Sequence, residues 1–352
     1  SVSDTALDPG NVSIDLLWPT TDVNVSINEF FTFSTNVTCT AGTCGDIEMY
    51  LDPIAWYNSS YAYRRNITVS SSSALTNYPV NFTLDTATMI ADDKLQATCA
   101  DLRIVNSSNV EQDLYLEEGC NSSSTVIWFN ASSLSSGDNT FYVYYGSSVA
   151  SSVSNPDAVF DVFINFTRDG INSYGGSQDG DSADFRIIND TSLNMFNNNW
   201  KRTLRDVDIS TSGSLALEWR FINNGVEGEI NGIGLDNDDG LSQNRHYQVL
   251  GTQDWGTTET EQYSGSGDWE LMTQVLDDYT GTFDRLFFTN DADGGQATNV
   301  TYRNVRVRQY TSSEPTSTVG TEEQATKGLV STVVGDTPFY TTDANPQSGG
   351  CL

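Results

Sequence analysis

The sequence predicts an all-β protein in which an Ig-like partial sandwich precedes β-sandwiches of the jelly-roll kind. Helical periodicity is almost absent, and short alternating or β-branched segments recur along the chain. Clusters of Gly, Asn, Asp and Ser separate these segments, as is typical of sandwiches. The 352 residues are enough for two or three domains.

Residues 1–53 predict the Ig-like part. Strands are expected at 12–18, 30–39 and 47–51, and the second of them alternates apolar and polar side chains. Three strands are too few for the roughly seven of a complete Ig-like sandwich. The sequence therefore predicts an incomplete N-terminal domain.

Two β-domains follow, a sandwich over 54–160 and a jelly roll over 161–322. Strands of the first are expected at 63–70, 78–84, 101–105, 114–117, 126–130 and 140–145. Strands of the second are expected at 184–189, 215–222, 229–235, 246–251, 269–276, 285–289 and 299–310. That series is long enough for two sheets. The Ser-, Thr- and Pro-containing run 311–325 is predicted to be a linker.

The tail, 323–352, contains one expected strand, 329–334, and ends in a turn-rich run. This strand could complete the N-terminal domain of the same chain. It could instead pair with an exposed sheet edge of a neighbouring chain. A third interpretation is that it begins a further domain that the sequence does not include.

Five cysteines indicate an oxidising compartment. Cys39 and Cys44 flank a four-residue, Gly-containing turn and predict a disulfide; the other interpretation, half of a metal site, lacks partner ligands. Cys99 and Cys120 predict a second bridge. Cys351 is left over, which suggests pairing with another chain or with residues outside this sequence.

Twelve N-x-[S/T] sequons predict an extracellular, N-glycosylated protein. Eleven of them lie in the first 190 residues, although some are expected by chance where Ser and Thr are this abundant. The candidate glycosylation sites are Asn11, Asn24, Asn36, Asn58, Asn66, Asn81, Asn106, Asn121, Asn130, Asn165, Asn189 and Asn299.

The charge balance excludes several partners. Forty-seven acidic residues against 16 basic ones give a net charge of −31, which repels nucleic acid and anionic membranes. The sequence also contains no stretch near the ~20 apolar residues of a membrane span. The net charge predicts a solvated surface and does not by itself indicate a function.

Three landmarks carry a resemblance to a known family. They are the runs 56–65 (WYNSSYAYRR), 141–146 (FYVYYG) and 304–310 (NVRVRQY), joined by Glu314-Pro315 and residues 319–322. In this order they resemble an uncharacterised domain family of archaeal and bacterial surface proteins, associated with a concanavalin-A-like jelly roll. The resemblance spans roughly 56–323 and implies a concanavalin-like β-sandwich on a large extracellular protein, with no catalytic residues to transfer. The flanks are more loosely similar to Ig-like repeats of archaeal envelope proteins.

Two Asp-rich runs are candidate calcium sites, and otherwise no cofactor is expected. Asp236 and Asp238 occur in one, and Asp291 and Asp293 in the other, each beside glycine. Calcium takes six to eight oxygen ligands in tight turns. Neither run matches the EF-hand pattern, and Asp and Gly also dominate ordinary turns.

Aromatic residues in a Gly-rich stretch are candidate sugar-binding residues. Trp255, Tyr263 and Trp269 could stack on carbohydrate if they are exposed on a jelly-roll face. The alternative is that they pack in the core or at its rim.

The sequence predicts that the protein is not an enzyme. Its single histidine, His246, is expected on a surface or edge strand, with no nucleophile elbow in the sequence. A glycosidase needs two opposed carboxylates. The candidates Glu218, Glu227 and Glu229 are interpreted as solvated side chains.

The leading hypothesis is an extracellular structural glycoprotein that forms an archaeal surface filament, pilus-like fibre or surface layer. In it, each N-terminal domain accepts the 326–340 strand of the next copy, so the partners are copies of the same chain. The alternative is a carbohydrate-binding adhesin module, whose partner is cell-surface carbohydrate.

Overall fold

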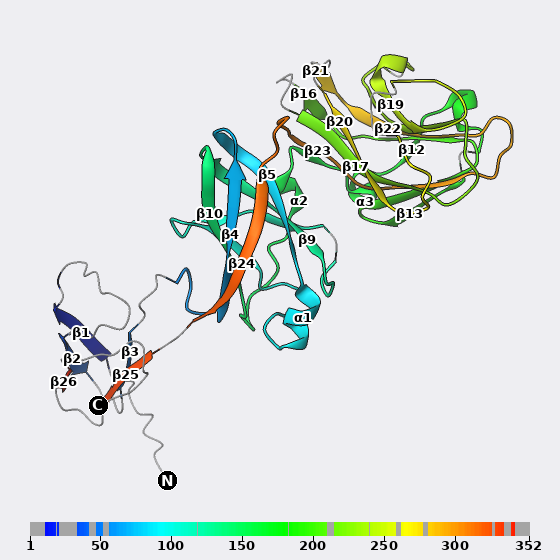
Figure 1. Cartoon of the computed structure of the whole chain (residues 1–352). Helices are drawn as coiled ribbons and strands as arrows, with labels where there is room; N and C mark the ends of the chain where they lie inside the picture. The colour runs from blue at the N-terminus through cyan, green and yellow to red at the C-terminus, as the bar shows by residue number, and fades with distance from the viewer. Residues whose placement is uncertain are drawn as a thin grey trace, which may run out of the picture. The chain divides into compact units, whose positions relative to one another are not determined.

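A computed structural model describes most of the chain and is almost entirely β-structure (Figure 1). The described residues are 11–18, 20, 34–41, 47–51, 56–117, 119–181, 183–209, 215–238, 240–257, 262–276, 281–325, 328–333 and 339–341. The chain forms two compact units, one from residues 1–62 and 323–352 and one from residues 63–322. No helix among the described residues is long and apolar enough to cross a membrane.

The first unit joins the two ends of the chain. One sheet has the order β1-β2-β26, and a second pairs β3 with β25. Both tail pairings are antiparallel. The strands are β1 (Asn11–Trp18), β2 (Ser34–Ala41), β3 (Ile47–Leu51), β25 (Gly328–Val333) and β26 (Phe339–Thr341).

The tail strands therefore pair within their own chain. Val333 lies opposite Ile47, and Thr341 lies opposite Thr35. This is the arrangement of the first interpretation of the tail, and pairing of the same strand with a neighbouring chain stays a prediction. Cys44 and Cys351 lie outside the described residues, as does the side chain of Cys39, so the predicted Cys39–Cys44 bridge and the unpaired Cys351 stay predictions.

The second unit begins with a sandwich of two antiparallel sheets, ordered β24-β4-β10-β6-β7 and β5-β9-β8. Alternate apolar residues of both sheets form one core, which includes Ile67, Val80, Ile104, Phe129 and Val143. Its strands are β4 (Tyr63–Ser71), β5 (Leu75–Leu84), β6 (Arg103–Asn106), β7 (Glu111–Gln112), β8 (Leu114–Leu116), β9 (Thr125–Leu134), β10 (Gly137–Tyr145) and β24 (Thr316–Gln324).

Strand β24 overturns the predicted linker. Residues 316–324 pair with β4 at the edge of the first sandwich, and Figure 1 shows the orange strand beside the blue one. Val319 packs against the core. Residues 316–322 therefore belong to the first sandwich and not to the predicted jelly roll over 161–322, although the second compact unit as a whole does end at residue 322.

The second sandwich lies in sequence between β10 and β24. Its sheets have the orders β13-β14-β23-β17-β20, with β11 beside β23, and β12-β15-β22-β18-β19. The strands are β11 (Val162–Phe163), β12 (Asn172–Ser173), β13 (Phe185–Asn189), β14 (Ser192–Phe196), β15 (Asn199–Thr203), β17 (Leu215–Asn223), β18 (Ile230–Asp236), β19 (His246–Leu250), β20 (Glu270–Val275), β22 (Arg285–Asp291) and β23 (Asn299–Gln309).

Short elements complete the second unit. β16 pairs with β21 as a separate ribbon, and the short helices begin with side-chain caps such as Asp85 and Asn155. Their bounds are α1 (Thr86–Ala91), α2 (Pro156–Val159), α3 (Phe166–Asp169), η1 (Gly176–Asp179), η2 (Gln243–Arg245), β16 (Val207–Ile209) and β21 (Gly281–Phe283).

A disulfide joins Cys99 to Cys120, the pair that the sequence predicted. The two cysteines are 21 positions apart in the sequence, and the segment between them contains the strands β6 to β8. A disulfide in a β-sandwich of this kind indicates an oxidising, secreted environment.

Buried ion pairs connect the two sandwiches. Glu117 of the first forms an ion pair with Arg306 of β23 at 3.1 Å, and Arg306 also pairs with Glu218 of β17 at 2.9 Å. Arg308 then joins Glu218 to Glu314, at 2.6 and 3.0 Å. Glu218 is thus 2% exposed, so its predicted role as a solvated carboxylate is wrong. Its buried charge is stable because two guanidinium groups compensate it.

Candidate functional site

The second sandwich carries an apolar cluster outside its core. The sheet β12-β15-β22-β18-β19 turns Ile233, Leu235 and Phe288 toward the core. Its other face bears a second cluster, and side chains alternate between faces along a strand. We call this cluster, together with the imidazole that stacks on it, the aromatic face: Tyr174, Trp200, His246, Trp255 and Phe287.

Two glycines allow the rings to cover the strands. Gly232 and Gly234 of β18 lie opposite Thr289 and Phe287 in the register of β22. A Cβ atom on Gly234 would lie 2.1 Å from the ring of Phe287, and one on Gly232 would lie 2.1 Å from the carbonyl oxygen of Tyr247. The aromatic rings therefore lie directly on the backbone of β18.

His246 lies on the edge strand β19, as expected, but its ring is buried in this stack and not at the surface. Its ring is stacked at 6.2 Å from Trp200 and 5.6 Å from Phe287, measured between centroids. Nε2 lies 2.9 Å from the hydroxyl of Thr289, and Nδ1 lies 3.2 Å from the carbonyl oxygen of Trp255. Burial lowers the pKa of His246 to about 3, so its imidazole is neutral at ordinary pH.

Trp255 and Tyr174 are the partly exposed members of the aromatic face. Trp255 lies edge-on to Trp200, with ring centroids 5.4 Å apart, and its backbone N–H donates to Gln248 Oε1 at 2.9 Å. The hydroxyl of Tyr174 donates to Asp236 Oδ2 at 3.0 Å. Both rings are thus held in place while part of each meets solvent.

The other two predicted sugar-binding residues lie elsewhere. Tyr263 is buried in the core of the second sandwich, where its ring is 5.2 Å from Phe221. Trp269 is half-buried under the guanidinium of Arg303, at 4.1 Å. Only Trp255 of the predicted three belongs to the aromatic face.

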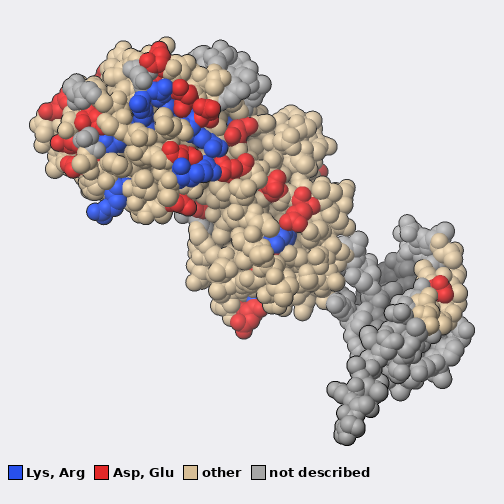
Figure 2. Space-filling model, turned by 180° about the vertical axis from the view of Figure 1, so that it is seen from behind, with Lys and Arg blue, Asp and Glu red and all other residues tan. Residues whose placement is uncertain are grey.

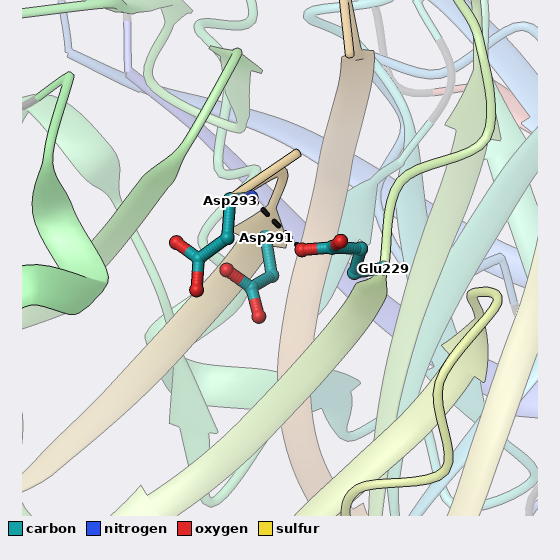
Figure 3. Close-up of side chains that lie close together, drawn as sticks. All are labelled: Glu229, Asp291 and Asp293. Carbon is teal, nitrogen blue, oxygen red and sulfur yellow. Dashed lines mark hydrogen bonds between the residues drawn. The ribbon is translucent and has the colours of Figure 1, made fainter. Parts of the chain in front are cut away.

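An acidic cluster lies at one end of the same sheet. Glu229 directly precedes β18, Asp291 ends β22, and Asp293 follows in the next turn (Figure 3). One carboxylate oxygen from each lies within 4.8 Å of the others. The backbone N–H of Asp293 donates to Glu229 at 2.9 Å, and Asn198 donates to Asp293 at 2.6 Å.

Asp291 is the buried member of the acidic cluster. It is 4% exposed, and its Oδ1 accepts no hydrogen bond from any part of the chain that the structure describes. Burial, and then the charges of Asp293 and Glu229, raise the pKa of Asp291 to about 6. Two carboxylates at this separation repel by about 3 kcal/mol at an effective dielectric constant of 20. A divalent cation would relieve that repulsion.

The second predicted calcium run, Asp236 and Asp238, lies at the opposite end of the same strand. Asp236 is buried and accepts from the backbone N–H groups of Asn237 and Asp238. Arg245 lies 3.5 Å from Asp236 and 3.0 Å from Asp238. A guanidinium group therefore occupies the place that a cation would need, and this run forms an ordinary turn.

The carboxylates considered for glycoside hydrolysis are dispersed. Glu218 belongs to the ion pairs between the sandwiches, Glu227 is exposed in a loop, and half-buried Glu229 is in the acidic cluster. Figure 2 shows acidic and basic side chains interspersed over the second sandwich, while the first shows few charged side chains on the same face.

The sequons divide by exposure. Asn58, Asn81, Asn121 and Asn189 are exposed. The side chains of Asn11 and Asn24 lie outside the described residues, and the half-buried sites are Asn36, Asn66, Asn106, Asn130, Asn165 and Asn299. Asn165 caps α3, and Asn194 donates to Asn299 at 2.7 Å, so both have structural partners.

Comparison with protein families gives one match. Residues 98–177 match a domain of unknown function, DUF2341. This segment contains Glu117, the disulfide cysteine Cys99 and the landmark 141–146, but not the landmarks 56–65 and 304–310. The match covers a minor part of the chain and supports the resemblance to an uncharacterised domain. No curated protein matches the sequence.

Solved structures show only remote similarity. One, from work on the promiscuous specificity of carbohydrate-binding modules of the β-sandwich superfamily, is 11% identical, with a TM-score of 0.24, and covers 71% of this chain and 99% of that one. Dimeric latent PorU from Porphyromonas gingivalis is 9% identical, with a TM-score of 0.17, over 70% of this chain and 24% of that one. Scores this low do not establish a common function.

Proposed function

We propose that the second sandwich is a carbohydrate-binding module of an extracellular surface glycoprotein. The observation that carries this proposal is the aromatic face, an apolar cluster on the side of the sheet that does not face the core. The outer face of an antiparallel sheet is usually polar. Trp200, His246 and Phe287 are buried within this cluster, and only Trp255 and Tyr174 meet solvent, so the part open to a ligand is the surface of these two rings.

Trp255 and Tyr174 are suited to contact sugar rings. Each is partly exposed, and each is fixed from behind by Trp200, at 5.4 and 6.3 Å between ring centroids. Rigid aromatic rings bind the apolar side of a ligand at little entropic cost. The exposed polar residues Gln253 and Asp254, adjacent to Trp255 in sequence, offer hydrogen-bonding groups for sugar hydroxyls.

The disulfide and the sequons support the extracellular part of the proposal. Cys99 and Cys120 are joined, which requires oxidising conditions, and four sequon asparagines are exposed. Placement at the cell surface fits both features. A filament assembled by strand exchange is less favoured, because β25 and β26 have partners in their own chain.

Binding of the full chain to immobilised polysaccharides and a glycan array tests the proposal. Trp255→Ala is expected to weaken binding by at least about tenfold, since truncating a central aromatic contact costs about 2 kcal/mol. Trp269→Ala is the matched control, because this tryptophan packs under Arg303 and not on the aromatic face. Equal losses in both variants, or no binding by the wild-type chain, would contradict the proposal.

The proposal includes binding without hydrolysis. Incubation of the chain with any polysaccharide that it binds is expected to release no reducing ends. Sugar release that Glu229→Gln abolishes would instead assign a catalytic role to the acidic cluster.

A further inference from the structure

We propose that Glu229, Asp291 and Asp293 bind a calcium ion at the end of the β18–β22 strand pair. The three carboxylates converge from two strands and a turn, and one oxygen of each lies within 4.8 Å of the other two (Figure 3). Calcium is bound in proteins by six to eight oxygens, mostly from carboxylates, carbonyls and water. Three convergent carboxylates are the charged part of such a set.

The burial of Asp291 is the second observation that points to a ligand. The residue is 4% exposed, and its Oδ1 has no hydrogen-bond partner among the described residues. The indole of Trp200 acts on the same carboxylate and lowers its pKa, but its N–H lacks hydrogen-bond geometry to Oδ1. A buried carboxylate oxygen without a donor is costly, and proteins normally satisfy it. Because the carboxylates of Glu229 and Asp293 converge on Asp291, a cation suits the missing partner better than a water molecule does.

The surrounding charges agree with this assignment. No Lys or Arg side chain that the structure describes forms an ion pair with Glu229, Asp291 or Asp293. The comparison within the same sheet is informative, because the other Asp pair, Asp236 and Asp238, is neutralised by Arg245. One end of β18 thus has a guanidinium group beside its carboxylates, and the other end has none.

A calcium ion here would fix the turn that follows β22. Gly295 donates to the carbonyl oxygen of Ala292 at 2.9 Å and has a φ of 75°, so the turn folds back tightly after Asp293. Asp293 belongs to that turn, whereas Glu229 and Asp291 belong to the sheet. The ion would therefore join the turn to the sheet, and its main effect would be on stability.

Calcium titration of the full, chelator-treated chain tests this inference. We expect isothermal titration calorimetry to detect one calcium ion per chain and the melting temperature to rise with calcium. Asp291→Asn is expected to weaken binding by at least about tenfold and to abolish the rise, because it removes a charged ligand. Asp293→Asn provides a second variant at an exposed position, where folding is not at risk.

Asp238→Asn is the matched control, since it removes one charge from the Asp pair that Arg245 already neutralises. It is expected to keep the full calcium response. The inference is overturned if wild-type protein shows neither heat nor a thermal shift, or if Asp291→Asn and Asp293→Asn respond as wild type does. Carbohydrate binding is not assumed, and Trp255→Ala is expected to bind calcium normally.

Discussion

At the scale of single residues, two glycines determine where the aromatic face can form. Gly232 and Gly234 have no side chain on the face where His246 and Phe287 cross β18. The imidazole Nε2 would lie 2.9 Å from a Cβ atom on Gly232. Any larger residue at either position would push a ring or a neighbouring strand away.

Gly232→Ala tests this packing. The added methyl group would lie 2.1 Å from the backbone oxygen of Tyr247, which cannot move without separating β18 from β19. We expect a loss of about 1–3 kcal/mol in the free energy of unfolding. The corresponding fall in melting temperature, several degrees, can be measured by calorimetry.

Gly119→Ala is the control for that experiment, because a Cβ atom at Gly119 meets nothing within 4 Å. It is expected to leave the melting temperature almost unchanged. If both variants melt like the wild type, the close approach of β18 and β19 is not what stabilises this sheet.

At the scale of elements, β24 is the strand that links the two sandwiches in the chain. It leaves the second sandwich and becomes an edge strand of the first, beside β4. All of its residues except Val319 and Gly320 are polar, so its sequence resembles a loop. Only Val319 packs against the core, and Gly320 gives room to Asn66, whose Oδ1 would lie 1.8 Å from an added Cβ atom.

Val319→Asp distinguishes a strand from a linker. A carboxylate at this half-buried position would face the core of the first sandwich, and we expect it to lower the free energy of unfolding by about 2 kcal/mol. Thr318→Asp places the same charge on the neighbouring, exposed side chain and should have little effect. Equal denaturant midpoints for the two variants would show that 316–324 behaves as a linker.

At the scale of the whole second unit, the buried ion pairs determine how its stability depends on pH. Burial raises the pKa values of Glu117 and Glu218, but Arg306 and the neighbouring donors outweigh it, so both pKa values are below the ordinary 4.5. A carboxyl group with a lowered pKa contributes stability above its unfolded-state pKa. That contribution is lost as the pH falls through the folded-state pKa values.

Glu218→Gln tests this dependence. At pH 7 the variant is expected to be about 3 kcal/mol less stable, because Arg306 and Arg308 each lose a buried partner. Its stability should also fall less steeply than that of the wild type when the pH is lowered below about 4.5. Denaturant unfolding between pH 7 and pH 3 measures both effects.

Glu111→Gln is the matched control for the pH series. Glu111 pairs with Arg103 at 3.2 Å with 38% of its side chain exposed, where ion pairs contribute little. A pH profile of Glu218→Gln that is parallel to those of wild type and Glu111→Gln would contradict the role of the buried pairs.

Much of the β-structure could be predicted from local patterns. The expected strands at 63–70, 215–222 and 299–310 correspond to β4, β17 and β23, because their apolar residues alternate or are β-branched. Strands β14 and β15 were not expected, since their Asn-rich sequence around Asn197 and Asn198 has the composition of a loop. Their pairing with β23 and β22 compensates for that weak local preference.

The candidate sites were only partly predictable for a similar reason. Asp291, Asp293 and Trp255 could be named as candidates because of their residue types near glycines. Sheet register alone brings Glu229 to the two aspartates and Trp200 to Trp255. Tyr263 has the same local features as Trp255 and is buried in the core. No short-range pattern separates these two aromatic residues, since the separation depends on which sheet face each one meets.

The sequence by itself determined the all-β class, most strand positions, and the Cys99–Cys120 disulfide with its oxidising compartment, because these follow from local alternation and composition. The tertiary structure decided which strands are neighbours. In it, β24 is an edge strand of the first sandwich, the tail pairs with the N-terminal strands, and Glu229 lies beside Asp291. Such pairings join residues far apart in the chain, and their energies come from burial and register, which no local window of sequence contains.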